Sequence, residues 1–63
     1  MTFIELHENG YPRLVNISQI SAIWGNDNDA WIWMVGESDS LFVDESYEQV
    51  KSKLQEAGFI WSV

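Results

Sequence analysis

The 63-residue sequence contains no cysteine, one histidine and only three basic side chains. Without cysteine the chain can form neither the disulfides that staple small secreted domains nor a thiolate zinc site. Three bases against ten acids give a formal net charge of −7 and leave no cluster of Lys and Arg to hold a phosphate backbone. We therefore expect no disulfide framework, no cysteine-based metal site and no direct binding of nucleic acid.

Long apolar stretches are also missing. The longest runs from residue 30 to residue 35, far short of the roughly 20 residues that a membrane span needs. The first residues show no basic stretch followed by an apolar one, as a signal peptide would. We expect no membrane insertion and a location in the cytoplasm of a bacterial cell.

The usual sets of catalytic and metal-binding residues cannot be assembled. His7 is the one imidazole, and it has no cysteine or strained Gly-flanked serine as a nucleophile, so an exposed strand histidine is the simpler interpretation. Asp27 and Asp29 could supply oxygen ligands, but Ala30 follows where a calcium loop of the EF-hand type needs further ligands and a glycine. We expect no catalytic residues, no metal and no cofactor.

Apolar residues make up 46% of the chain and aromatic residues 14%, including four tryptophans. This is too apolar for a disordered chain, and the length fits one domain over residues 1–63. Large aromatic side chains and oligomerisation are two ways for so short a chain to bury enough surface.

Alternating apolar residues and turn-forming residues predict about five short strands. The turns are indicated by Asn9-Gly10, by the polar segments 25–29 and 36–40, and by a local break at Asn16 and Ser18. The expected strands cover residues 3–7, 13–17, 20–24, 30–35 and 41–43.

A helix is expected after residue 46. Ser46 and Gln49 fit a capping box, apolar residues then recur at helical spacing, and Gly58 is a typical stop. The predicted fold is α+β: a small antiparallel β-meander of about five strands, one C-terminal helix packed on the sheet, and a short apolar tail over 59–61.

The order of these elements resembles the small FlbD-like proteins of bacterial flagellar operons and of other bacterial and phage genomes. The resemblance spans residues 3–54, and its best markers are Val15-Asn16 before Ile20-x-x-Ile23 and Glu45-Ser46 at the start of the helix. The turn over 36–40 is longer than in that family, and Trp31-x-Trp33 and the tail after Gly58 depart from its pattern. The resemblance implies a non-enzymatic accessory protein.

Acidic residues gather in the two central turns and at the start of the helix. They either keep the chain soluble and cap the helix, or form a negative surface that docks on a basic protein partner. The candidate docking acids are Asp27, Asp29, Glu37, Asp39, Asp44, Glu45 and Glu48.

Trp31 and Trp33 share one face of their strand, so both lie in the core or both face outward. Trp61 belongs to the apolar tail. One small sheet can hardly bury all the large aromatic residues, and tryptophan is enriched at binding hot spots. We expect at least one tryptophan at an interface with a protein partner or in a homodimer.

Two functions agree with these features. In size and charge the chain is similar to phage-encoded inhibitors of CRISPR or restriction nucleases, and we favour an anti-CRISPR-like stoichiometric inhibitor that occupies a basic nucleic-acid-binding surface of a host defence nuclease. The alternative is a FlbD-like structural or regulatory accessory protein that binds its partner through an apolar sheet face.

Overall fold

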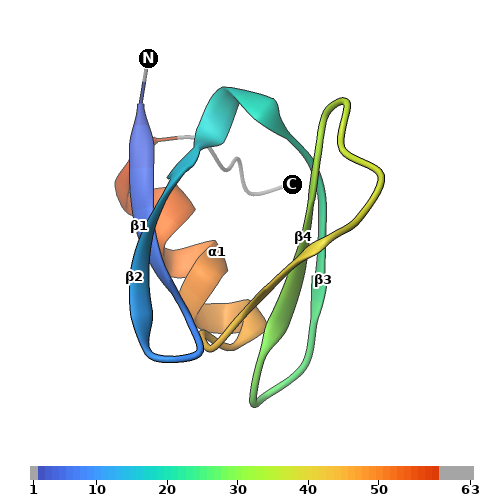
Figure 1. Cartoon of the computed structure of the whole chain (residues 1–63). Coiled ribbons are helices and arrows are strands. Elements are labelled where there is room, and N and C mark those ends of the chain that lie inside the picture. Colours follow the sequence, from blue (N-terminus) through green and yellow to red (C-terminus); the bar gives the residue numbers. More distant parts are fainter. Residues whose placement is uncertain (1, 59–63) are drawn as a thin grey trace.

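The computed structural model describes residues 2–58. In chain order the elements are β1 (Phe3–Glu8), β2 (Tyr11–Asn16), the short 3-10 helix η1 (Ile17–Gln19), β3 (Ile20–Gly25), β4 (Ala30–Met34), β5 (Leu41–Val43) and α1 (Tyr47–Glu56) (Figure 1). The α+β class and the order of elements are as the sequence predicts. The predicted tail over 59–61 lies outside the described residues.

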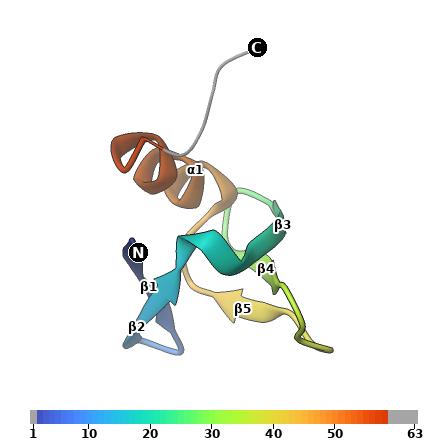
Figure 2. The ribbon, with the colours of Figure 1, turned by 90° about the horizontal axis from the view of Figure 1, so that it is seen from above.

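The strands form two sheets and not the single meander that we expected. β1 and β2 make an antiparallel hairpin, and β3, β4 and β5 make a separate antiparallel sheet in that order. The cause lies at the predicted break, where the Asn16 side chain accepts a hydrogen bond from the Ser18 backbone N–H (3.1 Å) and begins η1. This turn carries the chain away from β2 before β3 can pair with it, and Figure 2 shows the two sheets as separate units.

The turn between β1 and β2 follows from its two residues. Asn9 and Gly10 have φ values of 52° and 81°, which Asn and Gly adopt more readily than other residues. Such a turn matches the twist of the two strands and fixes their register, in which Ile4 lies opposite Val15 and Leu6 opposite Arg13.

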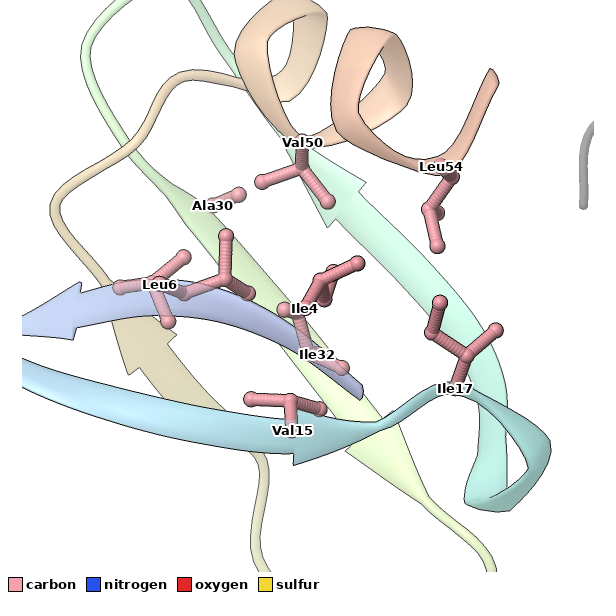
Figure 3. Close-up of a cluster of buried hydrophobic side chains, with 9 residues drawn as sticks. Ile4, Leu6, Val15, Ile17, Ala30, Ile32, Val50 and Leu54 are labelled. Carbon is pink, nitrogen blue, oxygen red and sulfur yellow. The ribbon is translucent and has the colours of Figure 1, made fainter. Parts of the chain in front are cut away.

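The core lies between the two sheets and the helix (Figure 3). Alternation along each strand turns one face inward, so Ala30 and Ile32 of β4 are buried while their neighbours on β4 face outward. Every buried hydrophobic residue among residues 2–58 is aliphatic, and these residues are Ile4, Leu6, Val15, Ile17, Ala30, Ile32, Val43, Val50 and Leu54.

Helix α1 covers this core and contacts both sheets, through β1 and β3. It begins with the predicted capping box: Gln49 N–H donates to the Ser46 hydroxyl (3.2 Å), and Ser46 N–H donates to the Gln49 side chain (2.9 Å). Val50 and Leu54, one turn apart, are its buried residues. No helix in the described part of the chain is long and apolar enough to cross a membrane.

Several backbone hydrogen bonds link segments that are distant in the sequence, and three of them lie at the ends of strands. Ile17 N–H donates to the Thr2 carbonyl (3.0 Å), Val35 N–H to the Gln19 carbonyl (2.6 Å), and Asp44 N–H to the His7 carbonyl (2.7 Å). The last bond joins the end of β5 to β1, which makes it the backbone link between the two sheets at that corner.

Shortening a buried side chain should destabilise the protein more than the same change at the surface. Ile32 is fully buried, so Ile32→Val should lower the free energy of unfolding by about 1 kcal/mol in urea denaturation. Leu14 is 66% exposed, and Leu14→Val, which also removes one methylene, should change it by less than about 0.5 kcal/mol. Equal losses in the two variants would contradict the described core.

Candidate functional site

Four large aromatic side chains lie together on the outer side of the β3–β4–β5 sheet. Trp24 of β3 and Phe42 of β5 lie opposite Trp31 of β4, on either side of it, and Trp33 lies two residues further along β4. Because side chains that face each other in a sheet lie on the same side, these residues form one surface, which we call the aromatic face: Trp24, Trp31, Trp33 and Phe42.

Three rings of the aromatic face, those of Trp24, Trp31 and Phe42, lie in contact, and the face remains open to solvent. The Trp31 ring centroid is 5.9 Å from that of Trp24 and 5.1 Å from that of Phe42, with the ring planes tilted by 44° and 56°. Trp24 is 67% exposed, Trp33 42% and Phe42 40%, while Trp31 between them is half-buried. Of the two interpretations of Trp31 and Trp33, core or surface, the structure therefore shows the surface. Contiguous exposed apolar side chains of this size are typical of interaction sites.

The acidic hairpin loop over residues 26–29, which joins β3 to β4, borders the aromatic face. Asn26 N–H donates to the Asp29 carbonyl (2.9 Å), and the Asn26 side chain accepts from the N–H groups of Asn28 (2.8 Å) and Asp29 (3.1 Å). Asp29 lies two residues before Trp31, in the loop that continues from the paired ends of β3 and β4. Asp27 is exposed at the tip.

Asp29 is half-buried, and its Oδ1 atom is shielded from solvent with no hydrogen-bond donor among the described residues. A shielded carboxylate oxygen without a donor costs free energy on the order of 1–3 kcal/mol.

Glu37 and Asp39, in the second acidic loop, line a different feature. An open groove of about 370 Å³ lies between β2 and this loop, with Arg13 and Leu14 on its opposite wall. The Arg13 guanidinium already pairs with Glu8 (2.7 Å). The groove is therefore mixed in charge, whereas the hairpin loop beside the indoles has acids alone.

Glu45 was a predicted docking acid, but it is only 8% exposed and its carboxylate serves the fold. Oε1 accepts a hydrogen bond from the His7 backbone N–H (2.9 Å), and Oε2 accepts one from the His7 ring Nδ1 (2.7 Å). The Lys53 ammonium lies 3.9 Å from Oε2. Burial acts to raise the pKa of Glu45, but the hydrogen bonds from the His7 ring and backbone outweigh it, so the pKa lies below its ordinary value of 4.5.

The simple interpretation of His7 as an exposed strand histidine also needs correction, because its ring is fixed by Glu45. An ionised carboxylate can only accept, so Nδ1 is the donor in this contact and Nε2 is left for other contacts. A histidine oriented by an acid is one part of a hydrolytic triad, but the shallow hollow beside it is lined by Gly10, Asp44 and Gln49, with no hydroxyl or thiol nucleophile. No group of three or more His, Asp or Glu that could hold a metal ion occurs in residues 2–58.

The predicted docking acids thus separate into several places. Asp44 is exposed, and its carboxylate accepts a hydrogen bond from Gly10 N–H (2.7 Å), which holds the β1–β2 turn. Glu48 is exposed in the first turn of α1. Of the seven, Asp27 and Asp29 are the pair in the loop that joins the two tryptophan-bearing strands, and Trp61 lies outside the described residues.

Sequence reasoning did not single out Trp24 and Phe42 as part of this surface. Their place depends on the register of β3 and β5 against β4, in which both lie opposite Trp31. The glycine at position 25 is a partial sequence signal for this register, because it indicates a tight hairpin between β3 and β4. A Cβ at Gly25 would lie only 2.7 Å from the Asp29 carbonyl oxygen.

Comparison of the chain with protein-family models, with curated proteins and with solved structures gave no match. The functional argument therefore rests on the residues and geometry described above.

Lowering the pH should remove the stability that Glu45 contributes. Because its pKa is lower in the folded chain than in the unfolded one, the contribution is complete above about pH 4.5 and is lost as the pH falls through the folded-state pKa. At about pH 5.5, Glu45→Gln should lower the free energy of unfolding by about 1–3 kcal/mol.

This loss should shrink as the pH falls from about 5.5 to about 3, as measured by urea denaturation of both proteins. Glu56→Gln, at an exposed acid of α1, is the matched control and should follow the original protein throughout. A difference between Glu45→Gln and the original protein that stays constant with pH would contradict the role given to the carboxylate.

Proposed function

We propose that this chain is a non-enzymatic, cytoplasmic protein-binding module of a bacterial cell that docks on a basic surface of a nucleic-acid-binding protein, in the manner of an anti-CRISPR-like inhibitor of a host defence nuclease. The observation that carries the proposal is the composition of β3, β4, β5 and their loops. Residues 20–45 hold six of the ten acids, of which only Glu45 is buried, and no Lys, Arg or His, and they also carry the aromatic face.

The negative charge of residues 20–45 would act first, during the approach of the partner. A surface of one sign attracts a partner of the opposite sign over several ångströms and speeds association, and it is screened by salt. The carboxylates of the loops would take positions that phosphates of the nucleic acid otherwise occupy. This competition would block the partner without any covalent step.

The aromatic face would then supply the short-range contact. Tryptophan is among the side chains enriched at the hot spots of protein interfaces, because a large ring is buried at little cost in conformational entropy. The exposure of these rings also favours the second candidate, an accessory protein of the FlbD-like kind that binds its partner through this sheet face. In that case binding would depend on the indoles and little on salt.

Affinity capture from bacterial lysate distinguishes the two candidates. With the full chain as bait, we expect a nucleic-acid enzyme that is held at low salt and released at high salt. Reversing the hairpin acids in Asp27→Lys/Asp29→Lys should weaken its binding by about tenfold or more at low salt.

The double variant Glu5→Lys/Glu56→Lys makes the same change in net charge at two exposed acids outside residues 20–45. It should bind nearly as well as the original chain. A partner retained at high salt and indifferent to the hairpin variant would instead support the accessory module. Equal losses in the two double variants would mean that only net charge matters and would contradict docking through this surface.

A further inference from the structure

We propose that the aromatic face, together with the hairpin acids Asp27 and Asp29, is a binding site for arginine side chains of a basic protein. This inference deepens the proposed function, on which it rests, by naming the chemistry of the partner. A guanidinium would stack on the exposed Trp24 ring and pair with the Asp29 carboxylate of the adjoining loop.

The first argument is that the site has acids and indoles but no cation of its own. Trp faces attract cations through the charge distribution of the ring. The three bases of the chain lie on other elements, Arg13 on β2 and Lys51 and Lys53 on α1. Arg13 pairs with Glu8, and the Lys53 ammonium donates to the Glu5 carbonyl (2.7 Å).

The second argument is geometric. The loop that joins β3 to β4 carries the carboxylates of Asp27 and Asp29 next to the cross-strand pair Trp24 and Trp31, and Trp24 is the most exposed ring of the aromatic face, at 67%. Arginine satisfies both groups at once, because its planar guanidinium stacks on a ring while its edge donates to a carboxylate. Lysine offers a point charge without a plane.

Other occupants fit these observations less well. A second copy of the chain would bring another net charge of −7 against the acidic hairpin. A flat sugar surface needs coplanar rings, whereas the neighbouring rings here are tilted by 44° and 56°. A nucleic acid would be repelled by the same carboxylates. Charge complementarity therefore makes a basic protein segment the occupant that best fits the aromatic face.

The test is a titration of the full chain with two peptides of equal length and charge, one of alternating arginine and glycine and one of alternating lysine and glycine. Binding is followed by tryptophan fluorescence and by calorimetry. We expect the arginine peptide to bind about tenfold more tightly than the lysine peptide. Trp24→Leu should abolish this preference while leaving the weaker electrostatic binding of both peptides.

Two matched controls separate the site from the general properties of the surface. Tyr11→Leu changes another exposed aromatic residue, which lies on β2 in the other sheet, and should keep the arginine preference. Asp29→Asn should weaken binding of the arginine peptide by about fivefold or more, while Glu56→Gln should have little effect. Circular dichroism of each variant checks that the fold is kept.

Equal affinity for the two peptides would overturn this inference, and so would an equal loss of preference in Trp24→Leu and Tyr11→Leu. A homodimer in light scattering that Trp24→Leu dissociates would also overturn it, because the face would already be covered. If the peptides bind equally but the Asp27→Lys/Asp29→Lys variant still loses the captured partner, the proposed function stands without the arginine site. If the arginine preference is found but no basic protein is captured, the arginine site stands and the proposed function fails.

Discussion

The Glu45 carboxylate is the contact on which the arrangement of the two sheets depends. It lies at the junction of β5 and α1, and it accepts hydrogen bonds from the backbone and ring of His7 on β1. The carboxylate of the neighbouring Asp44 accepts a hydrogen bond from Gly10 N–H in the β1–β2 turn, and the Asp44 N–H donates to the His7 carbonyl. Within the described residues these bonds fasten the first hairpin to the rest of the molecule, so the helix can close over a core shared by both sheets.

The core in turn decides where the aromatic residues lie. The space between two short sheets and one helix is filled by aliphatic side chains, with Ile32 and Val43 fully buried at its centre. Once Ala30 and Ile32 face inward, the alternation of β4 turns Trp31 and Trp33 outward. The exposed indoles are thus a consequence of the packing, and their gathering on one sheet follows from the register of β3 and β5.

Local features of the sequence predicted most of the elements. The turn at Asn9-Gly10 and the capping box of Ser46 and Gln49 form as expected, because both depend on residues close together in the chain. The division into two sheets was not predicted, since it requires knowing that the break at Asn16 becomes a 3-10 turn. The role of Glu45 was also missed, because its partner His7 is distant in the sequence and only the folded chain brings them together.

The aromatic face was likewise predicted only as far as local sequence features allowed. Alternation alone showed that Trp31 and Trp33 share a face, but it could not say which face is buried, and Trp24 and Phe42 join them only through cross-strand register.

The most direct test of the binding surface on β3, β4 and β5 is a nuclear magnetic resonance titration of the isotope-labelled full chain with the arginine peptide. We expect the largest shifts at the indole N–H groups of Trp24 and Trp31 and at the amides of the hairpin between them. Shifts centred on the β1–β2 hairpin or on α1, with those indoles unchanged, would contradict a binding surface on the outer side of β3, β4 and β5.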